Sequence, residues 1–291
     1  MSTAARLSDT ASALTLARTF LFVPANRPER YAKALASGAG AVIIDLEDAI
    51  GPDQKPAART QLEEAFAHLP LADRARVVIR INAAGTVWHA ADLALVGKLA
   101  HLGLAGVVLP KAESPAQLAH LAASVGQACA LLPMIETATG LVAIDDIARS
   151  PQVARLLFGN LDFQADLGMS CGPDEAELQP VRLALVVASR LAGLATAVDG
   201  VTPGTGDLAQ VQADAERSRR SGLGARLCIH PQQVPVVNAA LGPTAAEIHW
   251  ASRVLEQSSR TGGSVFTLDG RMVDEPVLRK ARHVLAQQLI A

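Results

Sequence analysis

A (β/α)8 barrel, also called a TIM barrel, is the fold class that this sequence predicts, and three observations support it. Eight short apolar runs recur along the chain, and stretches with helical periodicity lie between them. Only 3% of the residues are aromatic, so we expect an aliphatic core of the kind that helices form on a sheet. A doubly wound open sheet is the second candidate, but it usually has fewer strands, and its nucleotide-binding glycine motif is missing here.

Each apolar run predicts a strand that is buried on both faces, because runs this short and continuous are typical of a parallel sheet. Most of the runs end at a polar or charged residue. The predicted strands are residues 20–23, 41–45, 77–81, 106–109, 130–135, 155–158, 195–198 and 226–229.

The stretches between the strands carry the punctuation of helices. Pro28 opens the first stretch and Gly38 closes it. Ser114 is a good N-cap residue and is followed by Pro115 at the first helical position. The predicted helices are residues 28–37, 55–69, 91–102, 114–125, 140–147 and 181–191.

The two ends of the chain depart from this alternation. Residues 1–18 are rich in Ser, Thr and Ala, and we expect a disordered extension there, although the composition faintly resembles an organelle transit peptide. Residues 19–242 are expected to form the barrel.

Residues 243–291 predict a small C-terminal helical appendage or lid, packed at the barrel mouth of the same or a neighbouring subunit. Its predicted parts are a helix at 244–259, a break at Gly262-Gly263, an extended piece at 264–268, a turn at Asp269-Gly270 and a helix at 275–289.

Composition excludes several classes of protein. The net charge is −2 and no basic run is interleaved with aromatic residues, so we expect no nucleic-acid partner. No apolar run is long enough to cross a membrane. The three cysteines, Cys129, Cys171 and Cys228, are far apart, which favours reduced thiols and a cytoplasmic protein, or one of the mitochondrial matrix if the source is a eukaryote.

Polar side chains at the strand ends predict the active site, because TIM barrels carry it at the C-terminal ends of their strands. Seven of these side chains are carboxylates, which would repel each other by about 4 kcal/mol per close pair if no positive charge lay between them. Arg80 and Lys111 supply part of the positive charge, and oxygen ligands without a Cys or His cluster favour Mg²⁺ for the rest. The acidic residues at these ends are Asp45, Glu47, Asp48, Glu113, Glu136, Asp162 and Asp199.

A structural role competes with a functional one for each of these residues. A single carboxylate at a strand end is often only a helix cap or a turn residue, and Asp45 in particular is in register with a buried strand. Arg80 lies within an apolar run and needs an anionic partner, either a substrate carboxylate or a neighbouring acid. His230 is expected to have a hydrogen-bonded structural role, and Cys129 and Cys228 to be small buried residues.

Several motifs in order along the chain carry a resemblance to a known family. The sequence resembles the citrate lyase β-subunit family of the HpcH/HpaI aldolase superfamily, close to the malyl-CoA and citramalyl-CoA lyases. The motifs are LFVPANRPER at 21–30, IIDLEDA at 43–49, RIN at 80–82, LPK at 109–111, PMIET at 133–137, FG at 158–159 with Asp162, DGV at 199–201 and IHPQQ at 229–233.

This resemblance implies a trimeric or hexameric TIM barrel that binds Mg²⁺ through Glu136 and Asp162, with Glu136 also contacting substrate. Arg80 would bind the carboxylate of an oxo acid, and Glu47 and Asp48 would support the metal or Arg80. The motif at 270–276 resembles a lid that delivers an acid, Asp274, from a neighbouring subunit.

Two departures from the family pattern leave the coenzyme A contacts open. Ala25 stands where the family often has Gly, and Arg226 stands where it often has Lys.

The implied reaction is a reversible, Claisen-type cleavage of a 3-hydroxyacyl-CoA, of the citramalyl-, malyl- or citryl-CoA type, to an oxo acid and an acyl thioester. Asp274 would move the proton to or from the enolate carbon. Three alternatives stay open. They are an aldolase on free hydroxy-oxo acids, a malate-synthase-like or thioesterase-like enzyme, and a subunit or metabolite-binding component of a larger citrate-lyase-type complex.

Overall fold

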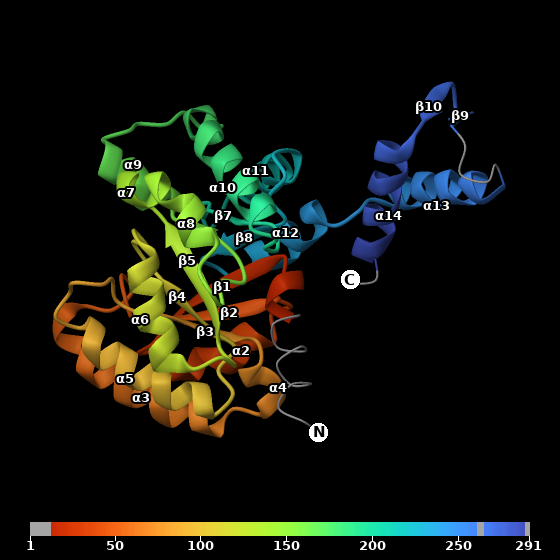
Figure 1. Ribbon diagram of the computed structural model, residues 1–291. Coiled ribbons are helices and arrows are strands. Elements are labelled where there is room, and N and C mark those ends of the chain that lie inside the picture. Colours follow the sequence, from red (N-terminus) through yellow and green to blue (C-terminus); the bar gives the residue numbers. More distant parts are fainter. Residues whose placement is uncertain (1–12, 261–264, 289–291) are drawn as a thin grey trace. The chain divides into compact units, whose positions relative to one another are not determined.

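Eight parallel strands form a closed barrel, in which each strand pairs with the next and the last pairs with the first (Figure 1). The computed structural model describes residues 13–260 and 265–288. The predicted TIM barrel is therefore confirmed. Its strands are β1 (Thr19–Pro24), β2 (Ala41–Asp45), β3 (Val77–Arg80), β4 (Gly106–Leu109), β5 (Ala130–Ile135), β6 (Leu157–Phe158), β7 (Val198–Asp199) and β8 (Ala225–Cys228).

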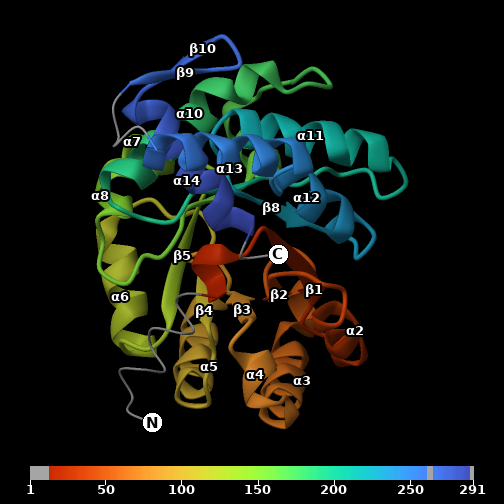
Figure 2. The ribbon, with the colours of Figure 1, turned by 90° about the vertical axis from the view of Figure 1, so that its right-hand side faces the viewer.

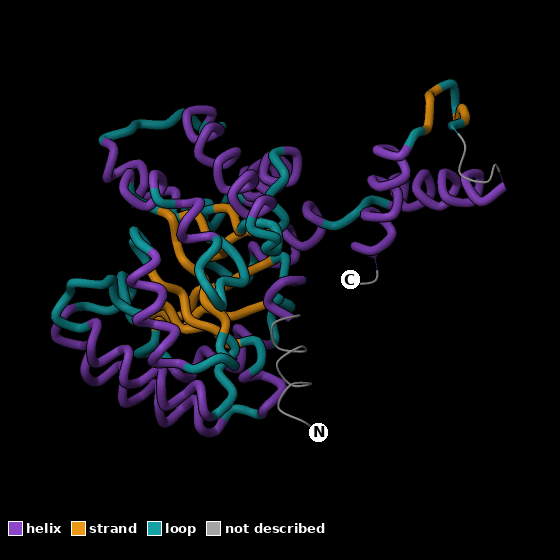
Figure 3. Tube along the Cα trace, in the orientation of Figure 1, coloured by secondary structure: helices purple, strands orange, loops and turns teal. Residues whose placement is uncertain are grey.

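Helices cover the outside of the barrel, as the purple tubes around the orange strands in Figure 3 show. The long outer helices pack side by side, α3 against α5 and α5 against α6 (Figure 2). They are α2 (Tyr31–Leu35), α3 (Lys55–His68), α4 (Leu71–Arg74), α5 (His89–His101), α6 (Pro115–Val125), α7 (Ala138–Val142), α8 (Ile144–Ala148), α9 (Asn160–Leu167), α10 (Gln179–Leu191), α11 (Leu208–Arg220) and α12 (Gln233–Leu241), with short 3-10 turns at Pro28–Arg30, Pro52–Gln54 and Ala176–Leu178.

The predicted helices are present with two changes. The first prediction, 28–37, is a 3-10 turn followed by α2, and the prediction at 140–147 is two short helices that meet at Ala143. Ser114, the predicted N-cap, forms a reciprocal capping box with Gln117 at the start of α6.

Alternation along the strands fills the barrel interior with aliphatic side chains and then places polar ones above them. Ile43 and Val78 belong to the interior core cluster. Two residues further along the same strands, Asp45 and Arg80 are direct partners in the β2–β3 register. Because side chains repeat every two residues in a strand, these two charged groups continue the inward-facing row towards the C-terminal ends.

The N-terminal boundary of the barrel lies earlier than predicted. Residues 1–12 of the expected extension lie outside the described residues, but Leu14 is fully buried in the interior core cluster. Arg155 is buried and donates hydrogen bonds to the carbonyls of Leu14 and Ala17 at 3.0 and 2.6 Å. The segment before β1 is therefore packed structure at least from Leu14 onward.

The chain divides into two compact units, Met1–Val237 and Asn238–Ala291. The second unit contains α13 (Ala245–Arg260), the antiparallel pair of β9 (Phe266–Leu268) and β10 (Arg271–Val273), and α14 (Glu275–Gln288). These elements share a small hydrophobic cluster that includes Val254, Val273 and Ala281. The predicted break at Gly262-Gly263 lies outside the described residues.

Two predictions of absence can be compared with the described residues. No helix in the described part of the chain is long and apolar enough to span a membrane. All three cysteines are described and none forms a disulfide, and Cys129 and Cys228 are buried.

Candidate active site

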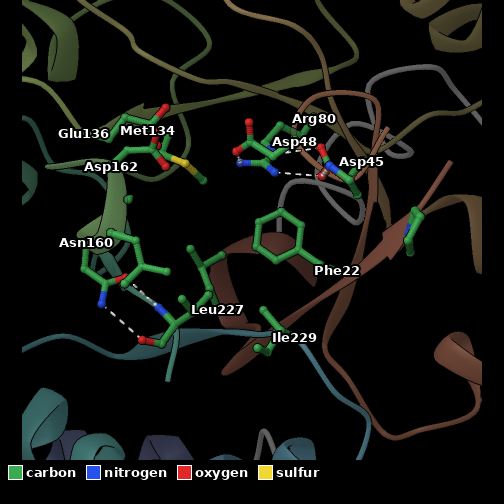
Figure 4. A pocket seen from close by; sticks show the side chains of 15 residues that line it. Phe22, Asp45, Asp48, Arg80, Met134, Glu136, Asn160, Asp162, Leu227 and Ile229 are labelled. Atoms are coloured by element: carbon green, nitrogen blue, oxygen red, sulfur yellow. Dashed lines mark hydrogen bonds and ion pairs between the residues drawn. The ribbon is translucent and has the colours of Figure 1, made fainter. Parts of the chain in front are cut away.

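A cavity of about 390 Å³ opens beyond the C-terminal ends of the strands (Figure 4). It has two chemically different sides. Its polar lining residues are Asp45, Asp48, Arg80, Glu136, Asn160 and Asp162, and its apolar lining residues include Phe22, Pro24, Met134, Leu161, Val201, Leu227 and Ile229.

Arg80 is held against the wall of this cavity by Asp45. Arg80 Nε and Nη2 donate to the two carboxylate oxygens of Asp45 at 2.7 Å each. The Phe22 ring covers the guanidinium, with its centroid 4.8 Å from Arg80 Cζ. The bidentate partner of Arg80 in this structure is thus a neighbouring acid, which agrees with the structural role suspected for Asp45 and fixes the plane of the guanidinium.

The remaining end of Arg80 faces two more acids. Its Nη1 lies 3.0 Å from Glu47 Oε2 and 3.4 Å from Asp48 Oδ2. Burial raises the pKa of Glu47 to about 7, even though Arg80 acts to lower it. Burial also acts to lower the pKa of Arg80, but Asp45, Glu47 and Asp48 together raise it above the ordinary value, so Arg80 stays charged.

Glu136 follows β5 directly and is almost fully buried, at 1% exposure. Its Oε1 accepts a hydrogen bond from the backbone N–H of Lys111 at 2.8 Å. Its Oε2 has no hydrogen-bond partner in the described structure. A Cβ at Gly159 would overlap with Oε2, so the glycine leaves the room that this carboxylate occupies. Burial, reinforced by Glu47, raises the pKa of Glu136 to about 8.

Lys111 stands among the carboxylates at the end of β4. Its Nζ lies 3.2 Å from Glu47 Oε1, 3.2 Å from Asp162 Oδ1 and 3.7 Å from Glu136 Oε1. Burial acts to lower its pKa, but the three carboxylates together raise it above the ordinary lysine value. Lys111 also has a φ of +47°, a left-handed backbone conformation that is uncommon outside glycine.

Asp162 is placed by the first turn of α9. Asn160 begins this helix and is almost fully buried, at 1% exposure. Its side chain exchanges hydrogen bonds with both the N–H and the carbonyl of Val201, and it also donates to Glu175 Oε1 at 3.0 Å. These bonds anchor the start of α9, so the Asp162 carboxylate lies over the cavity, beside Glu136 and Met134 in Figure 4.

The donor set fits a hard divalent cation of the Mg²⁺ type. No group of three or more His, Cys, Asp or Glu side chains that could hold a metal occurs among the described residues. Mg²⁺ does not need one, because it commonly takes one or two carboxylates and leaves its other positions to water and substrate. The unpartnered Oε2 of Glu136 and the nearby Asp162 supply such a pair.

The structure brings together most of the residues predicted for the site. Arg80, Asp48, Glu136 and Asp162 line the cavity, and Glu47 contacts Arg80 and Lys111. Asp274 belongs to the second unit, where its Oδ1 accepts from the Val277 N–H at 3.3 Å at the start of α14.

Three other strand-end residues considered in the sequence, Glu113, Asp199 and His230, do not line the cavity and have structural hydrogen-bond partners. Glu113 accepts from the Thr137 hydroxyl at 2.8 Å. Asp199 is fully buried between Arg182 and Arg226, which lower its pKa against the effect of burial. The ring of His230 accepts from the nearby Gln232 N–H at 3.3 Å, which is the local role expected for it.

Two features of the site were not predicted from the sequence. Lys111 was predicted as a source of positive charge and as part of the motif at 109–111, but not as the ion-pair partner of Glu136 and Asp162. The anchoring bonds of Asn160 had no signal, because its partners Glu175 and Val201 are 15 and 41 residues away in the chain.

Comparisons with known proteins decide the family. The family described as HpcH/HpaI aldolase/citrate lyase matches residues 18–231. This chain belongs to that family. The family resemblance and the enzyme class predicted from the sequence, a carbon–carbon lyase of the citrate lyase β-subunit type, are thereby confirmed.

Two relatives extend over almost the whole chain. A citrate lyase subunit beta-like protein of Mycobacterium tuberculosis is 38% identical over 271 residues, which are 91% of this chain and 93% of that protein. A (3S)-malyl-CoA thioesterase of Cereibacter sphaeroides is 33% identical over 273 residues, which are 93% of this chain and 94% of that protein.

Two solved structures share the fold. CitE from Mycobacterium tuberculosis, in complex with magnesium, acetoacetate and coenzyme A, has a TM-score of 0.80 and 37% identity, and covers 93% of this chain and 97% of its own. The citrate lyase beta subunit of the same organism, complexed with oxaloacetate and magnesium, has a TM-score of 0.67 and 38% identity, with 78% of this chain and 97% of its own covered.

Proposed function

We propose that this enzyme is a Mg²⁺-dependent lyase that cleaves a 3-hydroxyacyl-CoA, of the citramalyl-, malyl- or citryl-CoA type, into an oxo acid and an acyl thioester. The single observation that carries this proposal is the buried, unpartnered oxygen of Glu136 beside Asp162 and Arg80. Relatives with magnesium, coenzyme A and small acids bound to them support the same assignment.

Glu136 and Asp162 would hold the metal ion in this proposal. When bound, Mg²⁺ supplies Lewis-acid chemistry, since it polarises carbonyl oxygens and stabilises developing negative charge. Glu47 and Asp48, which face Arg80 at the rim of this site, would add negative charge that favours a divalent cation at the cavity.

Arg80 binds the carboxylate of the oxo acid in this proposal. The guanidinium has five N–H donors, and its two bonds to Asp45 leave one donor on Nη2 for a substrate. The two donors of Nη1 face Glu47 and Asp48, so a substrate carboxylate would share them with these acids. Because Asp45 and the Phe22 ring already fix the guanidinium, little side-chain entropy would be lost when substrate binds.

The apolar side of the cavity contacts the rest of the substrate. Phe22, Val201 and Leu227 offer a surface without charge, facing the acidic residues. An acyl chain lying there would exclude water from the reacting centre, which strengthens the charge interactions inside the site.

Asp274 is proposed to move the proton to or from the enolate carbon, delivered by a neighbouring subunit of a homo-oligomer, either a trimer or a hexamer. The free carboxylate oxygen needed for this role is compatible with its helix-capping bond, which uses Oδ1. A cytoplasmic location and the absence of nucleic-acid and membrane partners stay predictions.

Thioester hydrolysis is the second candidate, because a relative that is 33% identical is named as a (3S)-malyl-CoA thioesterase. Such an enzyme would release free malate instead of an oxo acid. An aldolase on free hydroxy-oxo acids would use the same site without coenzyme A, and a subunit of a citrate-lyase-type complex would need an acyl-carrier partner.

The test is a panel of citramalyl-, malyl- and citryl-CoA incubated with the purified enzyme and Mg²⁺, while oxo-acid release and free thiol are both followed. We expect oxo acid without free thiol for at least one substrate. Glu136→Ala should abolish Mg²⁺ binding and turnover, whereas the exposed control Glu63→Ala should not. Turnover retained in the Glu136→Ala variant would rule out the proposed site.

A further inference from the structure

The ammonium group of Lys111 lies beside both of the proposed metal ligands. Its Nζ is within ion-pair distance of Glu136 and Asp162, the two proposed metal ligands, and of Glu47. Among the described residues, Lys111 is the sole basic group at ion-pair distance from either of those two ligands. Arg80, by contrast, is paired with Asp45, Glu47 and Asp48.

The backbone holds Lys111 there against its own preference. A left-handed φ is unfavourable for a residue with a Cβ, and it persists only where the surroundings impose it. Here the Lys111 N–H is bonded to Glu136 Oε1 at 2.8 Å, so the same residue contacts Glu136 through both its main chain and its side chain. The lysine is therefore built into the site and does not merely pass near it.

Two cations beside the same pair of carboxylates repel each other. A divalent ion held by Glu136 and Asp162 would lie close to the ammonium, because Nζ is 3.7 Å from Glu136 Oε1 and 3.2 Å from Asp162 Oδ1. Like charges at such distances repel strongly in a partly buried site. Lys111 has a side chain that is 37% exposed, which gives its ammonium a way out towards solvent.

We propose that Lys111 is an internal counter-ion that holds the carboxylates together and is displaced when the divalent metal binds. This inference rests on the proposed function, since it takes Glu136 and Asp162 as the metal ligands. It adds that metal binding is an exchange of one cation for another. The lysine stabilises the metal-free enzyme and lowers the affinity of the site for Mg²⁺.

The first test titrates Mg²⁺ into EDTA-treated full-length enzyme by calorimetry. Lys111→Met keeps the length of the side chain and removes its charge, so we expect the Kd for Mg²⁺ to fall by about tenfold or more. Lys98→Met is the matched control, because Lys98 is exposed and pairs with Glu63 on the outer helices, and its Kd should stay unchanged. An unchanged or higher Kd in Lys111→Met would overturn the inference.

The second test uses the wild-type chain, so that it does not depend on a variant that folds. Lysine acetylation is followed by peptide mass spectrometry with and without Mg²⁺. The acetylation rate of Lys111 should rise several-fold with Mg²⁺, while that of Lys98 stays constant. A rate that is constant or falls at Lys111 would contradict displacement.

The outcomes separate this inference from the proposed function. If wild-type enzyme binds Mg²⁺ and Glu136→Ala does not, while both Lys111 results are negative, only the exchange is wrong. If Glu136→Ala binds Mg²⁺ as well as wild type does, the metal site itself is wrong.

Discussion

Glu136 has one oxygen bonded to the main chain and one without a hydrogen-bond partner, although the residue is almost fully buried. A buried carboxylate in this state is costly unless it is protonated or meets a cation. The raised pKa of Glu136 and its proposed metal binding therefore have a single cause, which is the burial of this side chain.

A pH dependence follows from that burial. The pKa values of Glu47 and Glu136 are raised to about 7 and about 8, so the metal-free folded protein binds more protons than the unfolded chain above pH 4.5. The stabilisation from these two bound protons is fully present below pH 4.5, the ordinary pKa of glutamate in the unfolded chain. It is lost as the pH rises towards about 8. Urea unfolding in EDTA should show the free energy of unfolding falling by at most about 1.4 kcal/mol per pH unit for each such proton.

Mg²⁺ should reverse this trend, because it binds the ionised carboxylate and stabilises the folded state by mass action. Glu136→Gln removes one of the two titrating groups and should flatten the slope in EDTA. A metal-free stability that rises from about pH 5 to 8 would mean that these carboxylates are ionised in the folded protein.

Gly159 is the second residue whose substitution is informative. In Gly159→Ala the new methyl group would overlap with Glu136 Oε2, so we expect a loss of Mg²⁺ affinity and a cost of about 1–3 kcal/mol in stability from overpacking. Gly51→Ala is the control, because nothing lies within 4 Å of its Cβ position and its φ is −58°. Equal Mg²⁺ affinities in the two variants would show that the metal site does not need the room that Gly159 leaves for the Glu136 carboxylate.

The rule that barrel chemistry lies at strand ends placed Arg80, Glu136 and Asp162 among the candidates, and the family resemblance gave them their expected roles. It could not predict the partners of each group. The bidentate bond of Arg80 goes to Asp45 because the β2–β3 register sets these residues side by side, and a register is not visible in one sequence. Lys111 reaches its partners through an unusual φ, which has no sequence signature outside glycine and asparagine.

Among the elements, the strands with continuous apolar runs were predicted best. The bounds of β2, β4 and β5 match the predictions at 41–45, 106–109 and 130–135. The strand predicted at 155–158 is shorter, since β6 contains only Leu157 and Phe158. Main-chain hydrogen bonds to the neighbouring strands already begin at Ala154, but the regular β5–β6 register starts at Leu157.

The helix α11 had no prediction, and its buried face explains why. Along with Val211 and Ala215, this face contains Asp214 and Ser218. Ser218 donates to Asp199 at 2.6 Å, and Asp214 accepts from Thr202 at 2.6 Å. Because this helix contains few strongly apolar residues and buries polar groups in a charge network, its apolar face is too narrow to indicate a helix in the sequence.

The loop before α10 should control the start of α9. Glu175 contacts Asn160, and it also pairs with the buried Arg182 and with Arg217 at 2.8 Å. In Glu175→Gln, Arg182 and Arg217 each lose one carboxylate partner but keep a second one. We therefore expect about 1–3 kcal/mol less stability and a weaker Mg²⁺ site through the loosened Asp162. Chemical denaturation and calorimetry would measure both quantities.

Glu177→Gln is the matched control for this element, because Glu177 is exposed in the same segment and accepts from the Gly172 N–H without contacting Asn160 or the two arginines. Its stability and Mg²⁺ affinity should both stay close to wild type. If Glu175→Gln lowers stability but leaves Mg²⁺ affinity intact, the loop supports the fold and does not position the metal ligand.

At the scale of the whole molecule, the proposed proton-transfer residue Asp274 belongs to the second unit, whereas the cavity belongs to the first. Asp274→Asn should keep the helix cap of α14, since Asn caps helices as well as Asp does. We therefore expect oxo-acid binding and folding to survive while turnover falls by at least about a hundredfold, the scale of general acid–base catalysis. Equal losses of binding and turnover would remove Asp274 from the proton-transfer role.

Mixing variants tests whether the second unit serves a neighbouring subunit. Glu136→Ala and Asp274→Asn chains, unfolded together and refolded, should regain activity well above either variant alone if each site combines two chains. Refolding each variant separately is the control. No recovery in a mixture that forms oligomers would place both residues in the same subunit or outside the mechanism.

The most direct test of the central claim is an anomalous diffraction map of crystals soaked with Mn²⁺, which takes oxygen ligands as Mg²⁺ does. We expect one strong peak in contact with the carboxylates of Glu136 and Asp162, with the Lys111 ammonium moved away. A peak elsewhere, or none at these two residues, would contradict it.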